Sequence, residues 1–73
     1  MEQITFELNG DYVELNNLLK LVGVVDSGGA GKALVAEGVV QVDGKIELRK
    51  STKIRAGQVV SLQGIKITVQ AAG

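Results

Sequence analysis

An Asp43-Gly44 dipeptide between two apolar-rich segments is the feature that most restricts the fold of this chain. Asp-Gly flanked by alternating residues is the strongest short-range signal for a β-hairpin, because both turn positions need positive φ. The sequence therefore predicts paired strands over residues 39–42 and 45–48. A second hairpin is predicted around Gln63-Gly64, with strands over residues 58–62 and 65–69.

The residues before these hairpins predict a strand and a helix. Polar residues alternate with an apolar set that is typical of a strand: Ile4, Phe6 and Leu8. The strand is expected to end at Asn9-Gly10-Asp11. The next apolar residues have the i, i+3, i+4, i+7 spacing of an amphipathic helix that ends at Gly23: Leu15, Leu18, Leu19 and Val22.

A second, shorter helix is expected to begin after Asp26 or Ser27, run to Glu37 and end at Gly38. It is intrinsically weak, because each internal glycine costs about 1 kcal/mol relative to alanine. We therefore expect tertiary packing to stabilise it through Ala33, Leu34 and Ala36. The order of elements predicts an α+β fold, with two short helices packed on a small, mainly antiparallel sheet of hairpins.

Composition restricts both the core and the chemistry. The 73 residues predict a single domain over residues 1–73, and its core must be aliphatic because only 3% of residues are aromatic. Cysteine and histidine are absent, which removes disulfides, the commonest metal ligands and the commonest general base. Two carboxylate pairs are better explained as helix caps and solvated faces: Asp11 with Glu14, and Asp26 with Glu37. We expect no enzymatic activity, no cofactor, no metal and no small-molecule substrate.

The N-terminus and the hydropathy pattern predict a soluble, cytoplasmic protein. The opening Met-Glu-Gln lacks the basic segment and apolar stretch of a signal peptide. No apolar run approaches the roughly 18 residues that a membrane span needs. The lack of cysteine also fits a reducing compartment.

Positive charge is concentrated in residues 45–55, called the basic segment below. It contains five of the eight basic residues, opposed only by Glu47: Lys45, Arg49, Lys50, Lys53 and Arg55. Residues 1–37 carry a net charge of −4 and residues 38–73 a net charge of +4. Steering of a charged partner depends on local potential, so this asymmetry favours a nucleic acid over a merely solvated face. With Phe6 and Tyr12 as the only aromatic residues, recognition of folded RNA by backbone and shape is favoured over base stacking.

The glycine-rich stretch at residues 28–32 does not match a nucleotide-binding loop. A Walker motif needs glycine where Asp26 stands and Ser or Thr where Ala33 stands. Two interpretations stay open. The open backbone N–H groups at the helix start, with Lys32 one turn further on, could contact an anion. Alternatively, the glycines could simply allow close approach between the two helices.

The order and spacing of these residues over about residues 12–62 resemble the RNA-binding domain named after ribosomal small-subunit protein S-four. The resemblance rests on Leu15-x-x-Leu18-Leu19-Lys20-x-x-Gly23, on Ser27, on Lys32-Ala33-Leu34-Val35-x-x-Gly38-x-Val40-x-Val42-Asp43-Gly44-Lys45, and on Ile54-x-x-Gly57-Gln58-x-Val60. Small stand-alone bacterial members are the most similar, through Glu14-Leu15, Asp26-Ser27-Gly28-Gly29, Ala36-Glu37-Gly38 and Arg49-Lys50.

The resemblance implies two helices packed on a small sheet (the alpha-L motif), with RNA contacted by the helices and by the segment after the hairpin. By position, Ser27 matches the helix-capping serine and Lys32 the basic residue of the second helix. Arg is frequent in the family where this chain has Glu14 and Gly28, so binding is expected to depend more on the basic segment.

The sequence therefore predicts a monomeric, non-catalytic protein that binds structured RNA, ribosomal or transfer RNA being the expected classes. The predicted RNA-binding residues are Ser27, Lys32, Lys45, Arg49, Lys50, Lys53 and Arg55. A β-grasp sulfur carrier is an alternative, although this chain ends Ala71-Ala72-Gly73 and lacks the Gly-Gly terminus of that class. A plain protein-interaction module is the third possibility.

Overall fold

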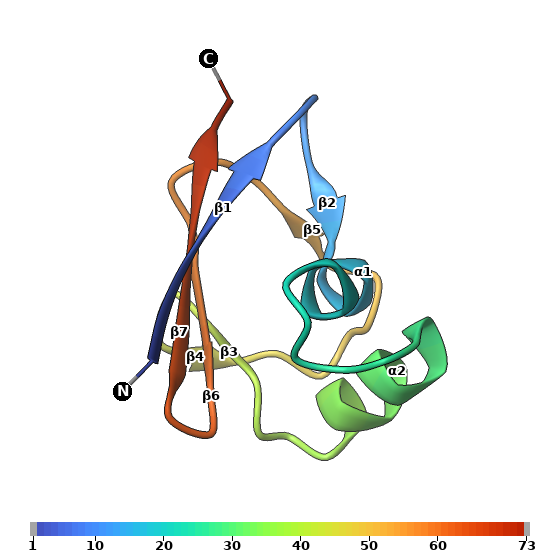
Figure 1. The fold of residues 1–73 in the computed structure, drawn as a ribbon. Helices are drawn as coiled ribbons and strands as arrows, with labels where there is room; N and C mark the ends of the chain where they lie inside the picture. The colour runs from blue at the N-terminus through green and yellow to red at the C-terminus, as the bar shows by residue number, and fades with distance from the viewer. Residues whose placement is uncertain (1, 73) are drawn as a thin grey trace.

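The computed structural model describes residues 2–72, which form a five-stranded sheet, a short two-stranded sheet and two helices that lie on one face of the larger sheet (Figure 1). In chain order the elements are β1 (Glu2–Leu8), β2 (Val13–Glu14), α1 (Leu15–Leu21), α2 (Gly28–Ala36), β3 (Gln41–Val42), β4 (Lys45–Ile46), β5 (Lys53–Ile54), β6 (Val59–Leu62) and β7 (Ile65–Ala71). The predicted α+β class is confirmed, as are both helices and both hairpins.

The main sheet has the strand order β1-β7-β6-β3-β4. Both predicted hairpins pair antiparallel, but β1 pairs with β7 in parallel, from Glu2 opposite Ile65 to Leu8 opposite Ala71. At the first hairpin Asp43 has φ +52° and Gly44 has φ +85°, the positive values that a two-residue turn requires. The longest strand pair therefore joins two segments that are far apart in the sequence.

A second, two-stranded sheet joins β2 to β5, with Val13 opposite Ile54 and Glu14 opposite Lys53. This short ribbon was not predicted from the sequence, and it places Lys53, a residue of the basic segment, in a strand. Val13 and Ile54 are both buried, so their packing into the core fixes the ribbon in place. Along an extended strand, alternate side chains face opposite sides, so the neighbours of these two residues face solvent.

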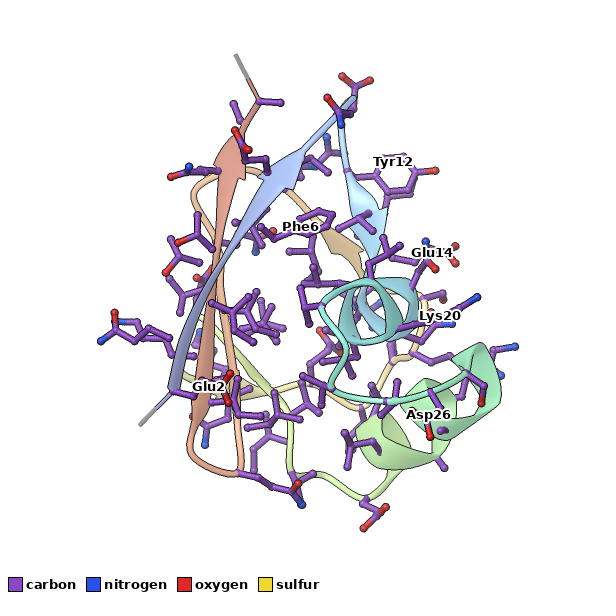
Figure 2. The ribbon with its side chains drawn as sticks, in the orientation of Figure 1. Glu2, Phe6, Tyr12, Glu14, Lys20 and Asp26 are labelled. Carbon is purple, nitrogen blue, oxygen red and sulfur yellow. The ribbon has the colours of Figure 1, made fainter. Side chains whose placement is uncertain are left out.

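The core lies between the helices and the main sheet. Nine side chains are almost completely buried there: Leu15, Leu18, Leu19, Val35, Val40, Ile54, Val60, Ile67 and Val69. Phe6 packs against this cluster from β1, and its ring points into the space between the layers (Figure 2). The opposite face of the sheet is polar, with Thr5, Lys66 and Thr68 exposed.

The prediction for the packing of the second helix is confirmed for Leu34, which packs against the core, and is wrong for Ala33 and Ala36. Gly31 and Val35 are buried and Leu34 is partly buried, whereas Ala33 and Ala36 are exposed. A Cβ placed on Gly31 would lie 2.8 Å from the backbone oxygen of Asn16, so α1 and α2 touch through their backbones at this glycine. Close helix approach, one of the two interpretations of the glycine-rich stretch, is therefore confirmed for Gly31. Neither helix of residues 2–72 is long and apolar enough to cross a membrane.

Candidate nucleic-acid interface

The loop that connects β4 to β5, residues 47–52, is docked on the first turn of α1. The backbone N–H of Leu15 donates to the carbonyl oxygen of Thr52 at 2.9 Å, and that of Asn16 donates to the carbonyl oxygen of Lys50 at 3.0 Å. The first N–H groups of a helix have no partner within the helix, so such acceptors are needed. The cap position, Glu14, makes no side-chain capping bond. The connecting loop therefore caps α1, and α1 in turn fixes the backbone that carries Arg49 and Lys50.

An open depression of about 370 Å³ lies on this loop and is lined by Arg49, Ser51, Thr52 and Lys53. Arg49, Ser51 and Lys53 are exposed and carry a guanidinium, a hydroxyl and an ammonium group that can donate to an anion, whereas the Thr52 hydroxyl oxygen is buried. A second depression, of about 180 Å³, has no charged residue in its lining: Val39, Gln41, Ser61, Leu62, Gln63, Gly64 and Ile65. Charge therefore distinguishes the depression on the connecting loop as the candidate site.

Arg49 is oriented by Glu47. The Glu47 carboxylate accepts a hydrogen bond from the Arg49 backbone N–H at 3.1 Å, and its Oε2 lies 3.5 Å from Arg49 Nε. The hydrogen bond from the Arg49 backbone and the nearby guanidinium charge lower the pKa of Glu47. The Arg49 side chain is still 82% exposed, and ion pairs at this exposure are weak. Arg49 thus remains accessible to an external anion.

A hydrogen-bond chain ties the first hairpin to the end of the basic segment. Asp43 accepts from the Val59 N–H at 2.9 Å and from Gln58 Nε2 at 3.2 Å, while Gln58 Oε1 accepts from the Arg55 N–H at 2.7 Å. The Val59 bond, followed by the Gln58 bond, lowers the pKa of Asp43. The backbone at Arg55 is therefore fixed by the hairpin, just as the backbone at Lys50 is fixed by α1.

The structure separates the predicted binding residues into three groups. Arg49, Lys50 and Lys53 lie on or beside the connecting loop, and Arg55 follows β5. Lys45 lies on β4 at the edge of the main sheet and does not line the depression.

The third group is on α2. Ser27 is its N-cap, with Oγ accepting from the Ala30 N–H at 3.2 Å, and Lys32 is exposed on the helix. Of the two predicted cap candidates, Ser27 is therefore the one that caps. Its hydroxyl oxygen already accepts one of the N–H groups that an anion at this helix end would need.

Three residues at or beside the candidate interface were not predicted from the sequence: Ser51, Thr52 and Tyr12. Ser51 and Thr52 line the depression, but hydroxyl residues in a loop carry no signal of their own. Tyr12 lies beside Lys53 and Arg55 only because β2 pairs with β5. The two-residue strands of that ribbon are too short to show an alternating pattern.

The class defined by this arrangement is a small α+β domain that displays a basic loop against the start of its first helix. Residues 6–70 match the S4 domain family. The chain is 52% identical over 60 residues to YbcJ of Escherichia coli (strain K12), which is provisionally named an RNA-binding protein, and the match covers 82% of this chain and 86% of YbcJ. YbcJ of Shigella flexneri matches with the same identity and coverage.

The solution structure of Escherichia coli YbcJ superimposes with a TM-score of 0.66 and 44% sequence identity, over 97% of this chain and 89% of that one. That structure was described as revealing an alphaL motif involved in RNA binding. The chain therefore belongs to the S4 domain family, and the resemblance to small stand-alone bacterial members is confirmed. The family match and the two consecutive helices favour this assignment over the β-grasp alternative.

Proposed function

We propose that this protein binds structured RNA without catalysing a reaction, and that the basic segment contacts RNA phosphates. The observation that carries the proposal is the depression on the connecting loop, with Arg49 and Lys53 in its lining and two hydroxyl residues between them. Guanidinium and ammonium groups are the usual donors to phosphate, and the exposed Ser51 hydroxyl adds a neutral hydrogen-bond donor. Membership of the S4 domain family and the RNA-binding description of YbcJ support the same conclusion.

The fixed backbone of the loop adds to the argument. Ordering a loop when a ligand binds costs free energy, so a loop that is already held binds more tightly than a mobile one. Here the carbonyl groups of Lys50 and Thr52 are held by α1 before any ligand arrives. Lys50 and Arg49 are exposed, and their charges are free to contact successive phosphates along an RNA backbone.

The start of α2 supplies a second, weaker contact in this proposal. Lys32 is exposed on the first turns of the helix, which contain no acidic residue, and Ser27 keeps this helix end formed. The partial positive charge of a helix N-terminus favours phosphate. Lys45, on the far edge of the main sheet, contributes mainly to long-range attraction.

The test is the salt dependence of RNA binding. Replacing Arg49 and Lys50 with Ala is expected to weaken binding to unfractionated transfer RNA and to flatten the slope of log K against log salt by about one to two units. Lys66→Ala is the matched control, because Lys66 lies on the polar face of the sheet, away from the helices. A double variant that binds as tightly as the wild type at every salt concentration would refute the proposal.

The RNA itself is proposed to be ribosomal or transfer RNA. Sequencing the RNA that co-purifies with the wild-type protein, and is lost from the Arg49/Lys50 double variant, would identify it. Recovery of a protein partner without RNA would instead favour the interaction-module alternative. That this protein is a monomer and that it is located in the cytoplasm stay predictions from the sequence.

A further inference from the structure

An aromatic ring next to the β2–β5 ribbon, that of Tyr12, has two cations beside it. Lys53 Nζ lies 4.9 Å from the centroid of the Tyr12 ring, and Arg55 Cζ lies 5.9 Å from it. Both distances are within the range of cation–π attraction. Arg55 Nη1 also donates to the backbone oxygen of Asp11 at 3.4 Å. Tyr12, the residue before β2, is 43% exposed, and its side chain extends away from the main sheet (Figure 2).

The register explains why these three side chains meet. Val13 and Ile54 face each other and point into the core. In an antiparallel pair the neighbouring residues then project to the other side, which places Tyr12, Lys53 and Arg55 on one solvent-facing surface. The cluster is therefore fixed by the buried pair beneath it.

The charges of Lys53 and Arg55 are not neutralised by the nearby acids. Glu14 is the register partner of Lys53, yet among residues 2–72 neither Lys53 nor Arg55 forms an ion pair with a carboxylate. The cations lie over the ring instead. An aromatic face restricts the motion of a cation but leaves its full positive charge available to another anion.

We propose that Tyr12, Lys53 and Arg55 form a second phosphate-binding subsite for RNA, in which Tyr12 is a positioning residue. The ring restricts two long side chains before binding, and phosphate oxygens are then contacted by Lys53 and Arg55. This subsite rests on the proposed RNA-binding function and extends the surface from the connecting loop along β5 toward β2. Lys53 also lines the loop depression, so the two subsites are continuous.

RNA binding by variants of these three residues distinguishes a residue that positions the cations from a residue that contacts phosphate directly. Tyr12→Leu removes the ring but no charge, so it should weaken binding of transfer RNA about two- to ten-fold while leaving the salt slope unchanged. Tyr12→Phe keeps the ring face and should bind like the wild type. Lys53→Gln and Arg55→Gln should each reduce the magnitude of the slope of log K against log salt by about 0.7–0.9, because each variant removes a phosphate contact.

A measurement without RNA tests the same contact. Ring-current shifts should move the side-chain methylene protons of Lys53 and Arg55 upfield in the NMR spectra of the wild type and Tyr12→Phe. The shifts should disappear in Tyr12→Leu, whose thermal unfolding is followed in parallel to confirm that it folds.

Three results would each contradict the proposed subsite. The first is a wild-type spectrum without these shifts, and the second is a Tyr12→Leu variant that binds RNA as tightly as the wild type. The third is a Tyr12→Leu variant whose binding is weakened only for single-stranded RNA of one base composition. The last result would make the ring a base-stacking platform. A wild-type protein that shows the shifts but binds no RNA would refute the proposed function and not the geometry of the cluster.

Discussion

Gly31 is the position where a single methyl group should disturb both the fold and the interface. A Cβ on this residue would lie 2.8 Å from the Asn16 carbonyl oxygen and 3.5 Å from the Asn16 carbonyl carbon and Cα. These are backbone atoms of α1, so no side chain can turn aside and the two helices must separate by a few tenths of an ångström. Overpacking of this kind costs about 1–3 kcal/mol.

Gly29 provides the matched control on the same helix. A Cβ there would meet only Ser27 Oγ, at the ordinary contact distance of 3.9 Å. Gly29→Ala and Gly31→Ala both gain helix propensity, about 1 kcal/mol for a glycine in a helix interior. The difference between the two variants therefore isolates the contact with α1. We expect Gly31→Ala to be less stable than Gly29→Ala by about 1–3 kcal/mol.

Thermal unfolding followed by circular dichroism measures this difference. For a domain of this size, 1 kcal/mol corresponds to about 4–8 °C in Tm, so the gap between the variants should be at least about 4 °C. Gly31→Ala should also weaken RNA binding, because Asn16 holds the Lys50 carbonyl and moves with α1. Equal Tm values for the two variants would show that α1 and α2 do not touch at Gly31.

Three further predictions concern the hydrogen bonds and charges around the interface. The hydrogen bond from the Val59 N–H lowers the pKa of Asp43 in the folded state, so the ionised carboxylate stabilises the fold. This stabilisation is fully present above the unfolded-state pKa, near 3.8. It is lost as the pH falls through the lower pKa of the folded state. Asp43→Asn should therefore reduce Tm at neutral pH and converge with the wild type as pH falls below the folded-state pKa of Asp43, and a Tm difference that does not change with pH would contradict this role. Ser27→Ala removes the cap of α2 and should cost about 1 kcal/mol in urea unfolding, whereas an unchanged midpoint would exclude capping. Glu47→Gln removes the negative charge beside Arg49 and should raise RNA affinity about two- to five-fold in fluorescence anisotropy, whereas weaker binding would show that the carboxylate positions Arg49 productively.

Local signals made the hairpins and helices predictable. Asp43-Gly44 specifies its own turn, and the leucine spacing in residues 15–22 specifies the buried face of α1, so neither depends on distant residues. The buried face of α2 could not be predicted in the same way. Its sequence, Gly-Gly-Ala-Gly-Lys-Ala-Leu-Val-Ala, has no clear apolar stripe, and the face is chosen by a backbone contact at Gly31.

The pairing of strands that are far apart in the sequence could not be predicted from the sequence. The parallel register between β1 and β7 depends on how both strands pack on the core, and no turn sequence joins the two strands and indicates their pairing. The ribbon between β2 and β5 depends on Val13 and Ile54 being buried together. For the same reason the basic residues were predicted from their charge, whereas the contact between Tyr12 and two of them was not.

The most direct test of the account is an NMR titration of the wild-type protein with a short stem–loop RNA. Amide resonances of the basic segment, above all residues 49–55, should change most, followed by those in the first turn of α2. Amides of the polar sheet face around Lys66 should change little and serve as the internal control. If the largest changes fell on that sheet face while residues 49–55 stayed unaffected, the basic segment would not be the RNA-binding surface.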